Sequence, residues 1–312
     1  MNSMKYISYI IGIVLIIFIQ SCDKIEPPYR DGNAGVTGAN DTVIIGNDTI
    51  FFDTDTRPNV KRVLAEDYTG HLCGNCPYAG VLLNDTIKNT YGDKLVVISV
   101  HAGFFAAPCP GGAACTGSAP AGSFATDFRD TISTDWDNFF GASSSGNPCG
   151  MVDRIDYPGN HEIKSPDQWN GIIQTEAALA PDFKMRIINH YNPSTNQLNT
   201  AIRSELLNNK TDTFKLQVVI TEDSIIDWQE WYPPFTPQFD PNYIHHHVLR
   251  KGVNGTFGTV LASGTITAGK VFLNGYTYTL HSSWNISHCK VVAFIYEASN
   301  YRVVQVEEQS VE

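Results

Sequence analysis

Apolar runs and helical spacing alternate in the first half of the chain. Residues 61–68 have the pattern of a strand, and residues 95–100 form a short, nearly continuous apolar run typical of a strand buried on both faces. Between them, residues 77–90 carry apolar positions at helical spacing. A strand, a helix and a strand within about 40 residues predict a βαβ unit with parallel strands.

After residue 181 the pattern changes to apolar and polar alternation broken by turn signals, without an intervening helix. Several short strands of this kind predict an antiparallel sandwich. Before this change, helices are expected over residues 127–140 and 165–180. Two alternating runs at residues 42–45 and 49–52 flank a Gly-Asn turn and predict a hairpin.

The first residues, 1–21, form a targeting segment outside the fold. Lys5 supplies a positive charge, and residues 9–19 are apolar but shorter than the ~20 residues that span a membrane. Cys22 then follows a small residue, which resembles a bacterial lipobox and makes Cys22 the predicted lipidation site. The alternative is ordinary cleavage that leaves Cys22 as a chance thiol. Residues 22–57 are interpreted as a tether that contains the hairpin.

Composition narrows the class of partner. The chain is 42% hydrophobic and 17% charged, which excludes a disordered chain and a coiled coil. Its 21 basic and 32 acidic residues give a net charge of −11. Because phosphate binding needs clustered positive charge, a nucleic-acid partner is excluded. No second apolar run reaches the length of a membrane span, so we expect attachment through the lipid anchor.

Export places the cysteines where disulfides are permitted, so they are interpreted as disulfide or redox thiols before metal ligands. Cys73-Gly-Asn-Cys76 follows a predicted strand and opens a predicted helix. A helix N-terminus favours the thiolate, so Cys73 is the predicted attacking thiol and Cys76 the resolving thiol. The alternative is an inert structural Cys73–Cys76 disulfide. A zinc site would need further ligands at suitable spacing, and neither a metal nor a cofactor is expected.

Three more residues bear on this chemistry. Asp67 lies six positions before Cys73, near the end of the preceding strand, where it is expected to exchange a proton with Cys76. Pro148 precedes a predicted strand, and a cis-proline there would offer a substrate strand a pairing edge beside the disulfide. His71 either stabilises the thiolate or merely sits on the loop. Together these features match a thioredoxin-like site.

The segments at residues 63–77 and 146–154 resemble a lipoprotein family of the Bacteroidetes, which is named after a twenty-eight-kilodalton outer membrane protein. Residues 243–250 and the end of the chain, residues 291–308, resemble the same family. The resemblance implies a location in the outer membrane, with the membrane contact made through the lipid anchor.

The resemblance also implies two domains. A thioredoxin-like α/β domain is expected over residues 58–180, with an insertion at residues 104–145, and an all-β immunoglobulin-like sandwich over residues 181–312. Carried over residue by residue, it makes the Cys-x-x-Cys motif the redox pair and Pro148 the cis-proline. Cys149 stands where a Thr commonly follows that proline, which puts substrate preference in doubt.

The other cysteines allow more than one interpretation. Cys109 and Cys115 flank a compact loop and are predicted to form a local disulfide, with a second exchange pair as the alternative. Cys149 is either a third exchange thiol or a small buried filler. Cys289 is expected to be buried and free.

Two further clusters stand out in the second half. His245 to His247 would allow a metal site if two of the rings shared a strand face, although a structural role is favoured. Residues 228–237 are rich in aromatics and proline and form either a binding loop at the edge of the β domain or, as the favoured alternative, a loop packed over the sandwich.

Two functions follow from these patterns. The first is a cell-envelope lipoprotein that exchanges thiols and disulfides with exported proteins and with an unknown redox partner. The second is a non-catalytic binding or scaffolding lipoprotein of the outer membrane, in which Cys73 and Cys76 form a structural disulfide.

Overall fold

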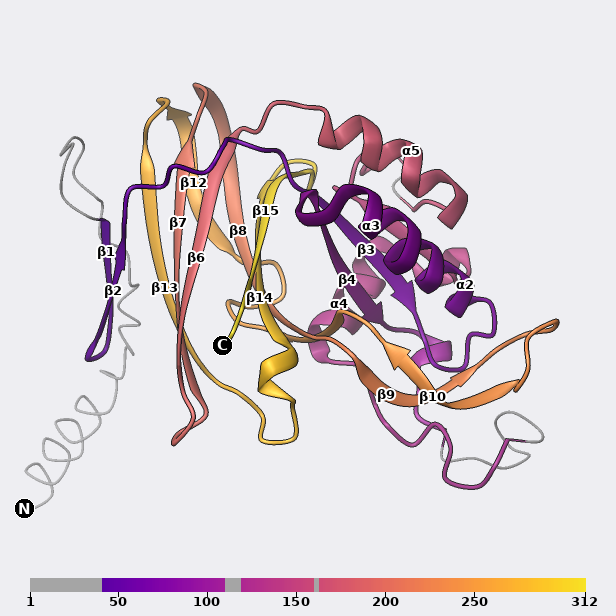
Figure 1. Ribbon diagram of the computed structural model, residues 1–312. Helices are drawn as coiled ribbons and strands as arrows, with labels where there is room; N and C mark the ends of the chain where they lie inside the picture. Colours follow the sequence, from indigo (N-terminus) through magenta and orange to yellow (C-terminus); the bar gives the residue numbers. More distant parts are fainter. Residues whose placement is uncertain (1–40, 110–118, 160–162) are drawn as a thin grey trace, which may run out of the picture. The chain divides into compact units, whose positions relative to one another are not determined.

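The computed structural model describes residues 41–109, 119–159 and 163–312, which belong to one compact unit (Figure 1). The predicted signal segment, Cys22 and Cys115 lie outside these residues. The described part is β-rich with few helices. None of the helices described is long and apolar enough to cross a bilayer.

The predicted hairpin within the tether is confirmed. β1 (Asp41–Ile45) and β2 (Asp48–Phe52) pair antiparallel. Val43, Ile50 and Phe52 bury one face of this hairpin against Ala201 of the three-stranded sheet described below. The hairpin is thereby fixed to the folded body by apolar contacts.

The predicted βαβ unit is also confirmed. β3 (Val63–Thr69) and β4 (Leu95–His101) are parallel over their whole length. A continuous helical stretch joins them, made of α2 (Cys76–Val81), the π-helical turn η1 (Leu82–Ile87) and α3 (Lys88–Tyr91), before the short 3₁₀ turn η2 (Gly92–Lys94). Leu83 and Ile87 of this stretch pack against the sheet residues Val63 and Val97.

Both further helices form where the sequence predicts them. α4 (Thr131–Phe140) begins after Asp130, which caps it together with Ser133, and ends at Gly141 in the left-handed conformation. α5 (Pro166–Ala177) begins after Ser165. The turn before β5 (Cys149–Val152) contains η4 (Ser143–Ser145), and η3 (Phe104–Ala106) follows β4.

After residue 181 the described chain consists of strands with one short 3₁₀ turn, η5 (Ile286–His288). The strands are β6 (Phe183–Asn192), β7 (Gln197–Leu206), β8 (Lys210–Glu222), β9 (Ile225–Glu230), β10 (Phe239–His245), β11 (Val248–Gly252), β12 (Thr259–Ile266), β13 (Val271–Thr279), β14 (Cys289–Glu297) and β15 (Val303–Ser310). A three-stranded sheet, in the order β13-β7-β6, shares an apolar core with β8, β12 and β14. This arrangement is the predicted antiparallel sandwich.

One eight-stranded sheet runs across residue 180, where we placed a domain boundary. Its order is β15-β14-β8-β11-β4-β3-β5, and β12 also pairs with β8. β11 and β4 join at Val248 and Ser99, and the Ser99 amide donates to the carbonyl of His247 over 2.8 Å. A single apolar core contains Tyr68 from one side of residue 180 and Phe294 from the other. The two halves are therefore continuous in sheet and core.

Charged residues of the two motifs at residues 63–77 and 146–154 pair with each other inside this core. The Arg154 guanidinium binds the Glu66 carboxylate with donor–acceptor distances of 2.8 and 2.6 Å, and both side chains are almost completely buried. Lys61 Nζ lies 2.6 Å from Asp153 Oδ2. Asp153 and Arg154 both have positive φ angles, of 46° and 49°, which these pairs hold in place. Much of the motif therefore serves the fold.

Candidate functional site

The Cys-x-x-Cys motif forms a closed turn between β3 and α2. The amide of Cys76 donates to the carbonyl of Cys73 over 3.0 Å, which brings the two Cα atoms to 5.3 Å. Cys73 and Cys76 form a disulfide with an S–S distance of 2.09 Å. The helix begins at Cys76, with Asn75 as its N-cap residue and Pro77 in its first turn. Cys73 therefore lies in the turn before the helix and not in the helix itself.

The chain around this turn is tightly packed on one side by η3 and the residues after it. A Cβ atom on Gly70 would overlap the backbone of Phe105, and the amide of Leu72 donates to the carbonyl of Phe105 over 2.9 Å. Nε2 of His71 lies 3.1 Å from the carbonyl oxygen of Ala107. Burial lowers the pKa of His71, so its ring is neutral near pH 7 and supplies no positive charge to a thiolate. The geometry favours the loop role for His71.

Asp67 lies two residues before the end of β3, the strand that precedes the motif, and is buried. Its Oδ1 atom has no hydrogen-bond partner among the described residues. Burial raises the pKa of Asp67 to about 7, because the charged form loses hydration that no protein donor replaces. A carboxyl group with this pKa can take up and release a proton near neutral pH.

Pro148 lies at the same end of the sheet as the motif. The Asn147–Pro148 peptide bond is cis. β5 starts at the next residue and runs antiparallel to β3, with Cys149 opposite Tyr68. Because β3 ends where β5 begins, Pro148 and the Cys-x-x-Cys turn follow adjacent strand ends. The role of Pro148 in substrate binding stays a prediction.

Two further cysteines, Cys149 and Cys289, do not have the properties of exchange thiols. The Sγ atom of Cys149 donates to the carbonyl of Ala142 over 3.3 Å, and burial, followed by the charges of Asp67 and Asp137, raises its pKa to about 12. Burial also raises the pKa of Cys289 to about 12. Both thiols stay protonated at pH 7, which supports the filler interpretation of Cys149.

The predicted Cys109–Cys115 pairing falls partly outside the described residues. Cys109 is buried and disulfide-bonded. Its predicted partner, Cys115, is not among the residues described, so this pairing stays a prediction.

The aromatic segment at residues 228–237 does not pack over the sandwich, which was the favoured alternative. It forms the end of β9 and the turn into β10, and this hairpin lies against the Cys-x-x-Cys turn (Figure 1). The amide of Glu230 donates to the carbonyl of His71 over 2.8 Å, and the amide of Tyr232 donates to the carbonyl of Gly74 over 2.9 Å. The hairpin and the surrounding fold together bury the two cysteines, so that Cys73 is only 3% and Cys76 only 2% exposed.

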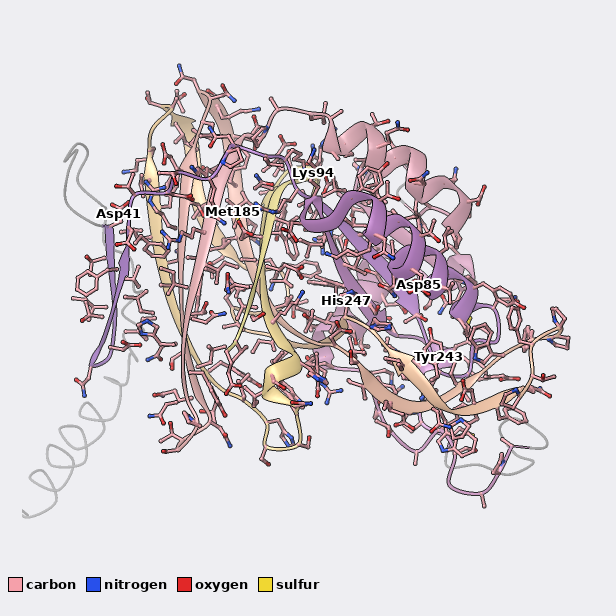
Figure 2. The ribbon with its side chains drawn as sticks, viewed as in Figure 1. Asp41, Asp85, Lys94, Met185, Tyr243 and His247 are labelled. Atoms are coloured by element: carbon pink, nitrogen blue, oxygen red, sulfur yellow. A yellow bond between two sulfur atoms is a disulfide. The ribbon has the colours of Figure 1, made fainter. Side chains whose placement is uncertain are left out.

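Aromatic side chains of the hairpin also contact α2. The ring of Tyr78 packs edge-on against Phe235 and Trp231, with ring centroids 4.8 and 5.7 Å apart. Tyr243, labelled on β10 in Figure 2, approaches Gly80 so closely that a Cβ atom there would lie 2.9 Å from its hydroxyl oxygen. Sequence reasoning missed this contact, and the only signal for it was the unusual aromatic and proline content of the segment.

The histidine cluster at residues 245–247 is divided between different neighbours. His245 packs against Phe128 and His101, with ring centroids 4.7 and 5.5 Å apart. Nδ1 of His246 lies 2.7 Å from the Asp223 carboxylate. Among residues 41–109, 119–159 and 163–312, no group of three or more His, Cys, Asp and Glu side chains is arranged to hold a metal ion.

Burial lowers the pKa of His245 to about 4, from 6.5 in an unfolded chain. A buried neutral histidine stabilises the fold fully above pH 6.5, and this contribution is lost as pH falls toward 4, because the unfolded chain binds the proton first. The expected loss for this one group between pH 7 and pH 5 is about 2 kcal/mol. Urea unfolding of His245→Gln at both pH values should show a drop that is smaller by this amount.

Phe51→Ala offers a control, since it truncates an exposed ring and removes no titrating group, and it should leave the pH dependence of unfolding unchanged. If His245→Gln and the parent lost the same free energy of unfolding between pH 7 and pH 5, the ring of His245 would not be neutral and buried.

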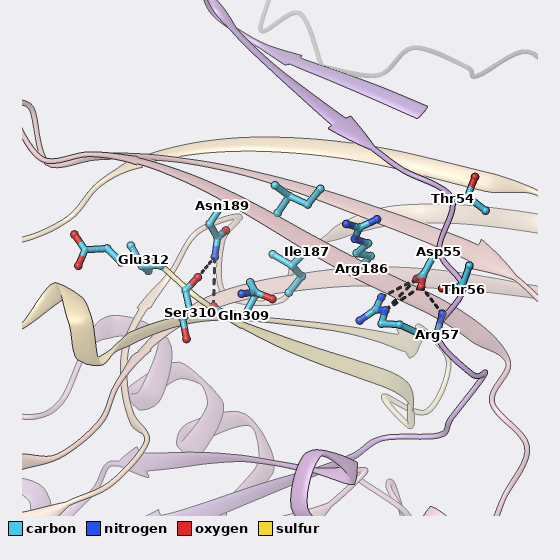
Figure 3. A pocket seen from close by; sticks show the side chains of 12 residues that line it. Thr54, Asp55, Thr56, Arg57, Arg186, Ile187, Asn189, Gln309, Ser310 and Glu312 are labelled. Carbon is cyan, nitrogen blue, oxygen red and sulfur yellow. Dashed lines mark hydrogen bonds and ion pairs between the residues drawn. The ribbon is translucent and has the colours of Figure 1, made fainter. Parts of the chain in front are cut away.

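A separate pocket of about 560 Å³ lies between the edge strands β6 and β15 and the segment after β2 (Figure 3). Its two arginines already have partners. Arg57 binds Asp55 and Glu307, and Arg186 donates to the carbonyl of Asp53. No cysteine lines this pocket, so it has no part in thiol chemistry.

Comparison with known proteins settles the family. The model of the family described as outer membrane protein Omp28 matches residues 135–312, which is more than half of the chain. The chain belongs to the Omp28 family. This membership confirms the resemblance seen in the sequence and places the protein in the outer membrane, a location that fits a lipid anchor. The Cys-x-x-Cys motif lies before the matched residues.

Two solved structures are similar to this chain. The chain is similar to HBP35 of Porphyromonas gingivalis, with 16% sequence identity and a TM-score of 0.56 over 81% of this chain and 76% of that chain. It also matches a domain of the outer membrane lipoprotein Omp28 from Porphyromonas gingivalis, with 18% identity and a TM-score of 0.29 over 42% of this chain and 89% of that chain. At these identities the HBP35 match shows a common fold alone. None of the curated proteins matches the chain in sequence.

Proposed function

We propose that this Omp28-family protein catalyses thiol–disulfide exchange on exported proteins while anchored to the outer membrane through a lipid on Cys22. The observation that carries the proposal is the Cys73–Cys76 disulfide in the turn between β3 and α2, which follows a strand that carries the buried Asp67, whose pKa is raised to about 7. Short-range cysteine pairs in this strand–turn–helix context are typical of redox sites.

A thioredoxin-like assignment for residues 58–180 belongs to the same proposal. It is supported by the parallel pair β3 and β4, the helical crossover that starts at the cysteine pair, and the antiparallel β5 that follows the cis bond at Pro148. The two facing sheets after residue 181 support an immunoglobulin-like assignment for residues 181–312. The two assigned regions share one sheet, as described above.

The exchange reaction is balanced by a dithiol on the substrate protein. One substrate thiolate attacks Cys73 Sγ, the Cys73–Cys76 bond breaks, and Cys76 leaves as a thiolate that takes up a proton. Asp67, protonated part of the time near pH 7, is the proposed proton donor in this step. The second substrate thiolate then attacks the substrate sulfur of the mixed disulfide and releases Cys73. Two electrons pass from the substrate to the cysteine pair, which an unidentified disulfide partner reoxidises, and the reverse sequence reduces a substrate disulfide.

A non-catalytic binding or scaffolding role is the second candidate. The observation that favours it is the burial of both cysteines, because an exchange catalyst needs its attacking sulfur to be accessible. In this case the pair would be a structural disulfide, and binding would depend on other surfaces.

A redox titration of the mature protein, read by differential alkylation and peptide mass spectrometry, separates the two candidates. For an exchange catalyst we expect the Cys73–Cys76 pair to have a reduction potential of roughly −270 to −120 mV. A potential below roughly −300 mV would mark a structural bridge and reject the catalytic proposal.

Replacing both Cys73 and Cys76 with Ser should reduce the protein's disulfide reductase activity toward insulin to background, because no attacking sulfur remains. Cys289→Ser is the matched control, since its thiol is buried and protonated, and this variant should keep the parent's activity. Activity that survives the double substitution, or a parent without activity, would contradict the proposal.

A further inference from the structure

The end of β9 and its turn, residues 229–238, cover the Cys-x-x-Cys turn, and we refer to them as the cap. Successive backbone amides of the cap donate hydrogen bonds alternately to the chain around the motif and to the other strand of the hairpin. The amides of Glu230 and Tyr232 donate to the motif, whereas the amide of Trp231 between them donates to Gln238 within the hairpin, over 2.7 Å. Alternation of this kind is the pattern of a strand paired at both edges. The backbone of the cap is therefore hydrogen-bonded both to the turn around the cysteines and to its own hairpin partner.

Side chains of the cap complete the cover. The buried amide of Gln229 donates to the carbonyl of Cys73 over 3.1 Å. The ring of Tyr232 lies directly on Gly74, where an added Cβ atom would overlap it. Glycine between the cysteines is therefore what permits this close approach. The hydroxyl of Tyr78 in α2 donates to the carbonyl of Tyr232 over 3.2 Å.

Only one face of the cap packs against the rest of the protein, and its other face is exposed. Tyr232 and Phe235 are 40% and 44% exposed, and Ile226 and Ile244, paired with each other on the hairpin, are also exposed. A segment with few buried apolar contacts and exposed backbone opens at low free energy compared with the core. The exposed turn of the hairpin can therefore leave the motif while Trp228 and Phe239, at its base, keep their packing against Phe124.

We propose that the cap occupies the surface on which a substrate polypeptide must lie, so that the Cys73–Cys76 disulfide reacts after the cap has moved away. This inference rests on the proposed exchange function. Displacing the cap frees the backbone carbonyls of His71 and Gly74, which then need N–H donors, whereas the carbonyl of Cys73 keeps its hydrogen bond from the amide of Cys76. An extended polypeptide with an aromatic residue supplies such donors and a ring for Gly74, so this is the substrate class that the site accepts.

The test measures how fast dithiothreitol reduces the Cys73–Cys76 disulfide in the full chain, and compares the parent with variants of the cap. Alkylation of the freed thiols and mass spectrometry give the rate. Tyr232→Ala removes the ring that covers Gly74 and should raise the rate by about tenfold. Replacing residues 232–237 with Asn-Gly shortens the turn and should have at least the same effect. Phe51→Ala, which truncates an exposed ring on β2, should leave the rate unchanged.

A reduction rate for Tyr232→Ala within about twofold of the parent's would overturn the proposal that the cap shields the disulfide. This variant is sufficient for the test even if the chain with the shortened turn does not fold. Slower exchange of Tyr232→Ala with a protein disulfide would also overturn it, because the ring would then recruit substrate. Faster reduction by dithiothreitol without protein disulfide exchange in any variant would support the cap and reject the exchange function.

Discussion

Arg154→Met is expected to lower the free energy of unfolding by about 3 to 5 kcal/mol, because it leaves the buried carboxylate of Glu66 without its partner. The Arg154 guanidinium donates two hydrogen bonds to Glu66, and both residues are 1% exposed. It also lies over the rings of Trp136 and Phe140, 4.8 Å from each ring centroid. Methionine would keep part of the apolar packing, so the loss reports chiefly the unpaired charge. Urea unfolding at pH 7 measures it.

The matched control is Arg129→Met. Arg129 pairs with Asp127 at 2.9 Å, yet both side chains are about a third or more exposed, and this change should cost under about 1 kcal/mol. Adding Glu66→Leu to Arg154→Met should restore much of the lost stability, because no buried charge then remains. Equal costs at residues 154 and 129 would show that the charge pair is not buried.

Asp67→Asn is expected to stabilise the protein increasingly as pH rises. The pKa of Asp67 is about 7 in the fold against 3.8 in an unfolded chain. Between these values the folded state binds more protons than the unfolded state, so the parent loses stability as pH increases. For this single group the loss between pH 5 and pH 8 is roughly 3 kcal/mol. Asparagine does not titrate, so unfolding of the variant should lack this fall.

Asp153→Asn provides the contrast: burial raises the pKa of Asp153 too, but only to about 6, because its carboxylate has partners. Asp153 accepts from Lys61 Nζ over 2.6 Å and from the amide of Leu64 over 2.8 Å. Removing its charge leaves Lys61 buried and unpaired, so this variant should be less stable than the parent at pH 8. A parent whose stability is level from pH 5 to pH 8, with Asp67→Asn parallel to it, would mean that Asp67 is hydrated or paired.

Features that depend on neighbouring residues were predictable. The strand–turn–helix context of the cysteines, the caps at Asp130 and Ser165, and the alternation after residue 181 all follow from local spacing and local hydrogen bonds. The disulfide between Cys73 and Cys76 was among the predicted alternatives because the two residues are only three positions apart. Family membership was also readable, because its motifs are local.

Contacts between distant residues were not predictable. Glu66 and Arg154 are separated by 88 residues, and in the sequence they look like ordinary surface charges. Gln229 and Cys73 are separated by 156 residues and meet through a backbone carbonyl, which every residue has. The favoured position of residues 228–237 over the sandwich was wrong for this reason.

The amino-acid sequence by itself therefore determined the elements, the βαβ unit, the sandwich and the place of the cysteine pair between a strand and a helix, since all of these rest on periodicity and short-range chemistry. Only the tertiary structure decided that one sheet and one core run across residue 180, that Asp67 is buried with an oxygen unpartnered among the described residues, and that the hairpin of β9 and β10 covers the cysteines. Burial and long-range pairing depend on how the elements pack against one another, and packing is a property of the folded chain as a whole.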